Sequence, residues 1–160
     1  MPVTDDLMHA LVAAARAARE RAYAPYSRFK VGAALLDEQG RLHAGCNIEN
    51  AAYPQGQCAE ASAIAHLVLA GGTRILAAVV VGGGVEMDMA LEMDMDMAMA
   101  VVAGAVARPP VTPCGGCRQR LREFAADDLP IWAADGQTVR GRYTLGALLP
   151  ASFGPDHLSP

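Results

Sequence analysis

Three cysteines and one glutamate stand in two short motifs whose spacing suits metal chemistry. Cys58 and Glu60 flank a single residue, and Cys114 and Cys117 form a Cys-x-x-Cys pair directly after Pro113. Two cysteines three positions apart at the start of a helix lie on one face and can share an ion, to which Cys58 can add a third thiolate from another helix. The N-termini of both helices would point unpaired N–H groups at the sulfurs and favour thiolates.

An open coordination position separates a catalytic zinc site from a structural one. Three protein ligands leave room for water, whereas a fourth residue closes the site. Cys46 or one of the four histidines could be that fourth ligand, so residue counts leave both arrangements open. Glu60 favours the open site, because a carboxylate two residues beyond Cys58 can reach the water position and do general acid–base work there. A Cys-x-x-Cys pair alone is equally consistent with a structural zinc or a redox pair.

Helices and strands alternate along the chain and must bring these motifs together. We expect helices over 5–22, 58–70 and 113–126 with a short one near 145–149, and strands over 29–36, 41–48, 74–81 and 129–134. Thr4 can cap the first helix. In the second helix we assign three apolar side chains to the buried face: Ile64, Leu67 and Val68. Strands interleaved with helices predict an α/β sandwich, and the length predicts a single domain over residues 1–160.

A Met- and Asp-rich segment at about 85–107 fits neither pattern. Its methionines are separated mainly by Asp, Glu and Ala and lie at Met87, Met89, Met93, Met95, Met97 and Met99. The period of two suits an edge strand and the composition suits a helix, so the type of element stays open. We expect a solvated insertion between two core elements. The alternative is a subunit contact or a soft metal site made of thioethers.

Charge and composition exclude several classes of partner. The net charge is −4, and aromatic residues make up 5% of the chain. A protein that follows a phosphate backbone usually needs a basic stripe and stacking aromatics, so we expect a small-molecule substrate and no nucleic acid. No run reaches the roughly 18 apolar residues of a membrane span, and residues 1–6 lack the basic start of a signal peptide. We therefore expect no membrane partner and a cytoplasmic location.

Five ordered motifs carry a resemblance that covers nearly the whole chain. They are YSRFKVGAA at 26–34, GCNIENA at 45–51, CAE at 58–60, PCGGCRQ at 113–119 and LLPASFGP at 148–155. Together they resemble the small, homotetrameric cytidine deaminases that bind zinc through three cysteines. The combination of Cys-x-Glu with Pro-Cys-x-x-Cys also matches the general pattern of zinc deaminases, in which the first ligand is a histidine or a cysteine.

The resemblance implies a reaction, a cofactor and a fold. The reaction is the hydrolytic deamination of cytidine or 2′-deoxycytidine to uridine or deoxyuridine and ammonia, in pyrimidine salvage. One Zn²⁺ per subunit would activate the attacking water, with Cys58, Cys114 and Cys117 as ligands and Glu60 as the catalytic residue that moves protons. The fold would be a three-layer α/β/α sandwich with a mixed sheet of about five strands.

The resemblance also assigns residues to the nucleoside. Phe29 would pack beside it, Asn47 and Glu49 would hydrogen-bond the ribose hydroxyls, and Ala59 would contact the substrate. Two further aromatic residues would reach into the site of a neighbouring subunit of a homotetramer, so that active sites are shared: Tyr53 and Phe153.

One departure from the resemblance concerns charge. Many relatives carry an arginine directly after the glutamate of the first motif, where this chain has Ala61. Three thiolates around Zn²⁺ leave a net charge of −1, which opposes ionisation of the bound water. We expect the helix N-termini, with Arg118, to offset that charge.

Two other functions stay open on sequence grounds. The first is deamination of another amino-pyrimidine nucleoside such as blasticidin S, since those deaminases share the two cysteine motifs. The second is a non-catalytic structural zinc module, which would need a fourth protein ligand and would make Glu60 dispensable.

Overall fold

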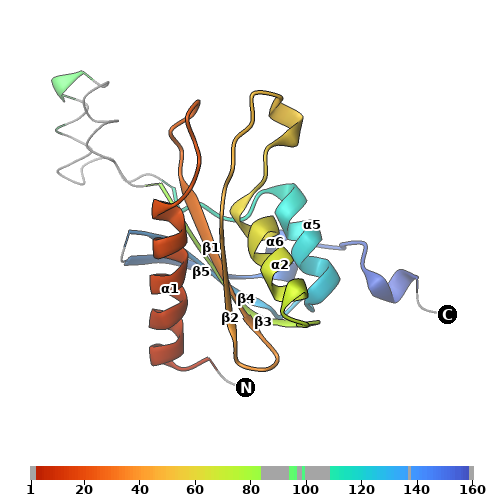
Figure 1. The fold of residues 1–160 in the computed structure, drawn as a ribbon. Helices are drawn as coiled ribbons and strands as arrows, with labels where there is room; N and C mark the ends of the chain where they lie inside the picture. The colour runs from red at the N-terminus through yellow and green to blue at the C-terminus, as the bar shows by residue number, and fades with distance from the viewer. Residues whose placement is uncertain (1–2, 84–93, 97–98, 100–108, 137, 159–160) are drawn as a thin grey trace.

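A five-stranded mixed sheet forms the centre of the fold in the computed structural model, which describes residues 3–83, 94–96, 99, 109–136 and 138–158 (Figure 1). The strands are β1 (Val31–Asp37), β2 (Leu42–Cys46), β3 (Ile75–Gly82), β4 (Pro130–Asp135) and β5 (Thr138–Thr144). Their order is β2-β1-β3-β4-β5, and the β3–β4 pair is parallel whereas the other three neighbouring pairs are antiparallel. The predicted mixed sheet is confirmed, and β5 is an additional strand that the sequence analysis had not placed.

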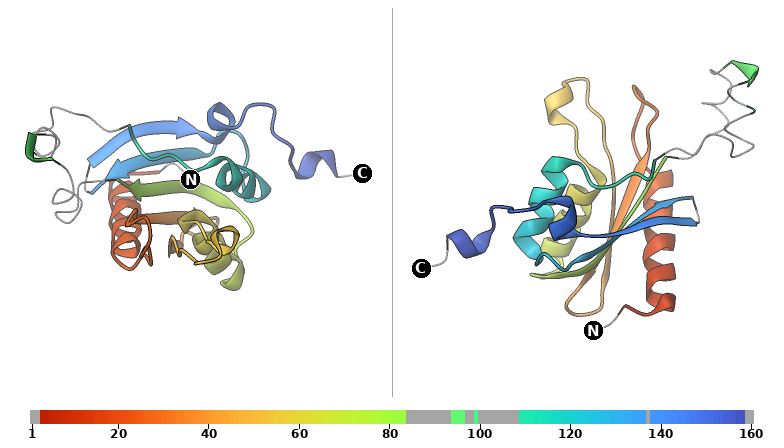
Figure 2. Two further views of the ribbon diagram at one scale, coloured as in Figure 1. Left: turned by 90° about the horizontal axis from the view of Figure 1, so that it is seen from above. Right: turned by 180° about the vertical axis from the view of Figure 1, so that it is seen from behind.

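Helices cover both faces of the sheet, which confirms the predicted α/β/α layers (Figures 1 and 2). The helices are α1 (Asp5–Glu20), α2 (Ala59–Leu69), α5 (Gly115–Phe124) and the short α6 (Leu145–Leu148), with 3-10 turns η1 (Tyr53–Gln55) and η2 (Pro155–His157). Side chains alternate along β1, so that Leu36 packs with α1 and Leu35 packs with α2 and α5 in two separate cores. Among the described helices, none combines the length and the hydropathy of a membrane-spanning segment.

The ends of the two longest helices follow from their local sequence. Thr4 caps α1, because its hydroxyl accepts a hydrogen bond from the backbone N–H of Leu7 at 3.3 Å. The chain leaves α2 through Gly71, whose φ of +79° is a left-handed conformation that favours glycine. The prediction that Val68 faces inward is wrong, since its side chain is 51% exposed, whereas Ile64 and Leu67 are buried as expected. Because α2 carries apolar residues on every side, periodicity could not select its buried face.

Two glycines let the helices approach the sheet at backbone distance. A Cβ at Gly32 would lie 1.9 Å from the carbonyl oxygen of Ala15 in α1. A Cβ at Gly45 would lie 2.3 Å from the backbone nitrogen of Ala63 and 2.6 Å from the carbonyl oxygen of Ala59, both in α2. Any side chain at these positions must displace a helix. The absence of a side chain at Gly45 therefore lets α2 pack directly against the backbone of β2.

A buried carboxylate closes the turn between β1 and β2. Asp37 accepts hydrogen bonds from the backbone N–H groups of Gln39 and Arg41 at 2.9 and 2.8 Å and from Arg41 Nε at 2.7 Å. His43 Nε2 lies 2.8 Å from the same carboxylate. Burial alone would raise the pKa of Asp37, but the hydrogen bonds from His43 and Arg41 outweigh it and hold the pKa far below its usual range.

The segment between β3 and α5 leaves and rejoins the core at nearly the same point. A Cβ at Gly82 would lie 2.9 Å from Val111 Cγ1, so the two ends of this connection are in contact. Most of the Met- and Asp-rich segment, and with it the choice between strand and helix, lies outside the described residues. Met95 and Met99 are described, and both are exposed.

The only tryptophan lies on the α1 side of the sheet. Trp132 in β4 is buried with Leu11, Val12 and Val79. The guanidinium of Arg142 on β5 sits 5.4 Å from the centre of its ring, a cation–π contact.

Candidate metal centre and pocket

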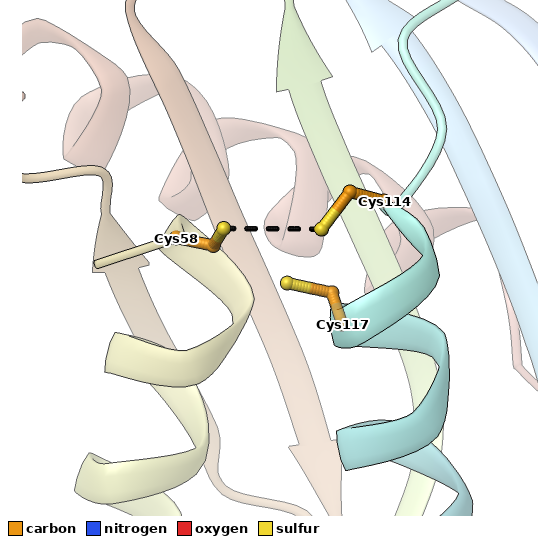
Figure 3. Close-up of side chains that lie close together, drawn as sticks. All are labelled: Cys58, Cys114 and Cys117. Carbon is orange, nitrogen blue, oxygen red and sulfur yellow. Dashed lines mark hydrogen bonds between the residues drawn. The ribbon is translucent and has the colours of Figure 1, made fainter. Parts of the chain in front are cut away.

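The three motif cysteines converge from two helix N-termini (Figure 3). Cys58 is the N-cap residue of α2 and Cys114 is the N-cap residue of α5, while Cys117 is buried in the first turn of α5. Their three sulfurs lie within 4.8 Å of one another. The Sγ atoms of Cys58 and Cys114 are 3.9 Å apart.

This sulfur geometry fits a tetrahedral zinc ion. Zinc binds thiolate sulfur at about 2.3 Å, which places two sulfurs of a tetrahedron about 3.8 Å apart. A disulfide would instead need about 2.05 Å, and all four cysteines are free thiols. In the described part of the chain, the cluster consists of the three sulfurs alone, without histidine or carboxylate, and Cys46 lies outside it. Three soft ligands without a fourth protein ligand match an open site rather than a closed one.

The pKa shifts of the three thiols indicate how a bound cation would affect their ionisation. Burial, followed by the charges of Cys114 and Glu60, raises the pKa of Cys58. Burial and the Glu60 carboxylate also raise the pKa of Cys117. Burial works against ionisation of Cys114 too, but hydrogen bonds from Cys117 and Cys58 outweigh it and lower its pKa. A bound cation deprotonates coordinating thiols outright, so it would supply the opposite charge that this cluster needs.

Glu60 sits beside the sulfurs inside the protein. It occupies the first turn of α2 and is only 4% exposed. Cys117 Sγ donates a hydrogen bond to Glu60 Oε2 at 3.3 Å. A buried carboxylate at this position can accept and return protons within reach of the sulfur cluster.

A cavity of about 580 Å³ opens above the cluster. Its volume lies in the range of small-molecule sites, about 300–1,000 Å³. Most of the predicted site residues line it: Phe29, Asn47, Glu49, Tyr53, Cys58, Ala59, Glu60 and Cys114. The fold therefore gathers residues from the loop before β1, the end of β2, the start of α2 and the start of α5 around one pocket.

Two of the pocket residues hold the loop before β1. Asn47 Oδ1 accepts a hydrogen bond from the N–H of Val31 at 2.8 Å, and its Nδ2 donates to the carbonyl oxygen of Phe29 at 2.9 Å. Glu49 Oε2 accepts hydrogen bonds from the N–H groups of Tyr26 and Ser27 at 2.8 and 3.2 Å. The Ser27 hydroxyl also donates to Glu49 Oε1, and this bond, together with the two backbone bonds, lowers the pKa of Glu49. Ser27 also lines the pocket, although neither its residue type nor its spacing in the sequence indicates a role there.

Arg118 secures the loop that delivers Cys114. Its Nε and Nη1 donate to the carbonyl oxygens of Pro113 and Leu148 at 2.7 and 2.8 Å, and its Nη2 donates to Thr112 Oγ1 at 3.1 Å. None of these bonds goes to a sulfur, so the charge expected from Arg118 acts at most through space. The N-termini of α2 and α5 place the positive ends of their helix dipoles at the cluster.

The two residues predicted to serve a neighbouring subunit differ in their position relative to the pocket of their own chain. Tyr53 lines the pocket of its own chain, with its ring edge-on to Tyr26 at a centroid distance of 6.3 Å. Phe153 is not among the pocket residues; it is 56% exposed and stacks on His157 at 5.0 Å. Gln119 Nε2 in α5 donates to the carbonyl oxygen of Phe153 at 2.8 Å. Their role toward another subunit stays a prediction.

A family model and individual relatives both match this chain over most of its length. Residues 5–133 match the family model of the cytidine and deoxycytidylate deaminase zinc-binding region. The cytidine deaminase of Sporosarcina psychrophila is 38% identical over 149 residues, which span 93% of both chains. That of Mycobacterium tuberculosis (strain CDC 1551 / Oshkosh) is 40% identical over 137 residues, covering 86% of this chain and 82% of the relative.

Solved structures agree with the sequence relatives. The crystal structure of cytidine deaminase from Burkholderia pseudomallei superimposes with a TM-score of 0.71 at 38% identity, covering 91% of this chain and 98% of that one. The cytidine deaminase from Mycobacterium tuberculosis gives a TM-score of 0.69 at 35% identity, covering 94% and 98%. With the three-sulfur cluster, the buried glutamate and these matches in agreement, the chain belongs to the cytidine and deoxycytidylate deaminase family.

Proposed function

We propose that this protein hydrolyses cytidine, 2′-deoxycytidine or both to the corresponding uracil nucleoside with release of ammonia, as an enzyme of pyrimidine salvage. The observation that carries the proposal is the position of Glu60, a buried carboxylate in contact with a three-sulfur cluster at the base of a nucleoside-sized pocket. The cytidine deaminase relatives, which align over most of the chain, support the choice of cytidine.

The cofactor that fits the cluster is one Zn²⁺ per subunit. Cys58, Cys114 and Cys117 would hold it, because three sulfurs within 4.8 Å of one another, two of them 3.9 Å apart, suit a tetrahedral ion with one position open. When bound, zinc would supply Lewis acidity that makes a water molecule nucleophilic near neutral pH.

The chain's own residues carry the proton transfers. Glu60 takes a proton from the attacking water and delivers it to N3 of the cytosine ring as the new C–O bond forms at C4. It then passes the second water proton to the amine at C4, and the C–N bond breaks to release ammonia. Water and cytidine are thus converted to uridine and ammonia without an oxidant or reductant.

The pocket walls would orient the nucleoside for this transfer. Phe29 would pack beside the nucleoside, Asn47 and Glu49 would hydrogen-bond the ribose hydroxyls, and Ala59, at the start of α2, would contact the substrate. All four residues line the pocket that contains Glu60, which supports their assignment as a group. Ribose hydroxyls that bond to Asn47 and Glu49 must share these side chains with the loop before β1.

The protein would act as a cytoplasmic homotetramer with shared active sites, each chain being a single domain. Exposed aromatic side chains at the pocket support this assembly, because Tyr26 and Tyr53 are both exposed and their rings contact each other at a centroid distance of 6.3 Å, which gives an apolar surface suited to a subunit contact. Phe153, which is exposed and does not line the pocket of its own chain, is the residue we assign to a neighbouring site. Free thiols at the metal centre suit the reducing conditions of the cytoplasm.

The loss of cytidine absorbance, measured with and without a chelator, tests the function. We expect turnover that is abolished by the chelator and restored by added zinc. Glu60→Gln should retain zinc but lose turnover by about 10²–10⁴-fold, because the amide cannot accept the water proton. A zinc-loaded wild type that leaves cytidine unchanged would disprove the proposal. Turnover of blasticidin S instead would establish the other nucleoside, and full activity of Glu60→Gln would remove Glu60 from its role.

A further inference from the structure

Ser27 links a carboxylate of the pocket to the backbone of the pocket's phenylalanine. The Ser27 hydroxyl donates a hydrogen bond to Glu49 Oε1. Ser27 Oγ in turn accepts a hydrogen bond from the backbone N–H of Phe29 at 3.0 Å. The backbone N–H groups of Tyr26 and Ser27 donate to the other carboxylate oxygen at 2.8 and 3.2 Å. The three residues therefore form a relay that runs from Phe29 N–H through the Ser27 hydroxyl to Glu49.

The backbone between the two ends of this relay is strained. Arg28 has a φ of +56°, a left-handed conformation that is uncommon for a residue other than glycine. Its N–H donates to the carbonyl oxygen of Ala24 at 3.0 Å, which closes the turn. Such a conformation persists only where the surrounding structure fixes it, and the bonds of Ser27 act on the residues that flank Arg28 directly.

Asn47 secures the other side of Phe29. It bonds the carbonyl oxygen of Phe29 and the N–H of Val31, whereas Ser27 bonds the N–H of Phe29. The backbone of Phe29 is thus fixed at both of its polar groups, by side chains that line the same pocket. Loss of the Ser27 hydroxyl would release one of these groups and one bond to Glu49 together.

We propose that Ser27 is a positioning residue that sets the Phe29 ring and the Glu49 carboxylate jointly for nucleoside binding. The proposal rests on the proposed function, since it assumes that the pocket takes a nucleoside. The hydroxyl of Ser27 bonds Glu49 and the backbone of Phe29 rather than Glu60, so it acts on binding and leaves the chemical step unchanged. Its removal should therefore raise KM and spare kcat.

The carboxylate of Glu38 offers a matched control elsewhere in the chain. Glu38 accepts hydrogen bonds from the hydroxyl of Thr73 at 3.1 Å and from the N–H groups of Thr73 and Arg74 at 3.1 and 3.0 Å. This is the same combination of one hydroxyl and two backbone donors on one carboxylate. Neither Glu38 nor Thr73 lines the nucleoside pocket.

The test compares three variants with the zinc-loaded wild type. Ser27→Ala should raise KM for cytidine about fivefold with kcat within twofold, the size expected for one hydrogen bond. Ser27→Thr keeps the hydroxyl and should restore KM to near the wild-type value, and Thr73→Ala should leave KM unchanged. In the free protein, Ser27→Ala should speed hydrogen exchange at the Phe29 amide, with no change there in Thr73→Ala.

Each opposite result overturns the proposal. An unchanged KM in Ser27→Ala, or a fall in kcat at constant KM, would show that Ser27 does not position the substrate. An equal rise of KM in Thr73→Ala would show a general loss of stability. The activity of the wild type distinguishes failure of the proposed function from failure of the Ser27 proposal. If the wild type does not convert cytidine, the proposal falls with the function, and the exchange data still report whether the relay holds Phe29.

Discussion

Cys117 and Glu60 are in direct contact, with Cys117 Sγ donating to Glu60 Oε2 at 3.3 Å, although they belong to different helices. Both side chains are buried, so their contact is part of the packing between the start of α2 and the start of α5. The proposed metal ligand and the proposed acid–base residue are therefore placed by one packing arrangement. A change that shifts either helix should disturb metal binding and proton transfer together.

Each of the three clustered cysteines should be required for zinc. Cys58→Ser, Cys114→Ser and Cys117→Ser should each lose the metal and the activity, because a hydroxyl is a poor substitute for a thiolate on zinc. Cys46→Ser is the control and should keep both, since Cys46 lies outside the cluster. Elemental analysis of the purified variants measures this. Full zinc occupancy in Cys114→Ser would contradict the ligand assignment.

A methyl group at position 45 should displace α2. In Gly45→Ala the new Cβ would lie 2.3 Å from Ala63 N, so the helix must move off β2. We expect the free energy of unfolding to fall by about 2 kcal/mol, the usual size of an overpacking effect, and turnover to fall with it. Chemical denaturation compares it with Gly115→Ala, where a Cβ meets nothing within 4 Å and stability should change by less than about 0.5 kcal/mol. Equal stability of the two variants would show that α2 can shift without loss.

The buried carboxylate at the β1–β2 turn should make stability depend on pH. Its pKa is lowered in the folded protein, so Asp37 contributes stability above the unfolded-state pKa of about 4, and this contribution is lost as pH falls toward the folded-state pKa. Asp37→Asn should therefore lower the free energy of unfolding by about 2 kcal/mol at pH 7. The difference from wild type should shrink as the pH falls below about 4.

Denaturant titrations at several pH values measure this effect, with Asp135→Asn as the control. Asp135 pairs with Arg140 Nη1 at 2.6 Å on the surface, and a surface pair contributes less than about 1 kcal/mol. A pH-independent difference between Asp37→Asn and wild type would show that the lost stability comes from packing rather than charge.

The Met- and Asp-rich segment should be dispensable for turnover. Gly82 and Val111 are in contact, so a short connection can join them without moving β3 or α5. Replacing residues 86–100 with a short Gly-Ser turn should leave the deaminase activity and the oligomeric state unchanged, since a dozen residues more or less in a loop alters its closure by about 1 kcal/mol. Size-exclusion chromatography and the cytidine assay check both. Dissociation or aggregation would show that the segment belongs to the assembly.

The three-sulfur cluster could be predicted because each of its two motifs is a short pattern that is recognisable by itself. Cys114 and Cys117 are three positions apart at the start of α5, and Cys58 comes directly before α2, although only the fold brings together Cys58 and Cys114, which are 56 positions apart. The position of Ser27 could not be predicted in the same way, since its bond to Glu49 joins residues that are 22 positions apart. Only the folded loop brings that hydroxyl to the carboxylate.

The outer parts of the fold were harder for a related reason. Strand β5 (Thr138–Thr144) has no continuous apolar face, and its conformation comes from pairing with β4. The C-terminal segment follows contacts with α5, where Arg122 Nε and Nη2 donate to Ser152 Oγ and Asp156 Oδ2 at 3.2 and 2.8 Å. Such long-range polar contacts leave no periodic signal in the sequence.

The fluorescence of Trp132 reports on one face of the sheet, the face covered by α1. Trp132 is the single tryptophan, buried in the α1 layer under Arg142, while the sulfur cluster lies at the starts of α2 and α5 on the opposite side of the sheet. Its fluorescence therefore follows the loss of the α1 core and is insensitive to a local opening at the cysteines. Zinc release that precedes any change in emission identifies an opening of the site within a sheet that is still folded.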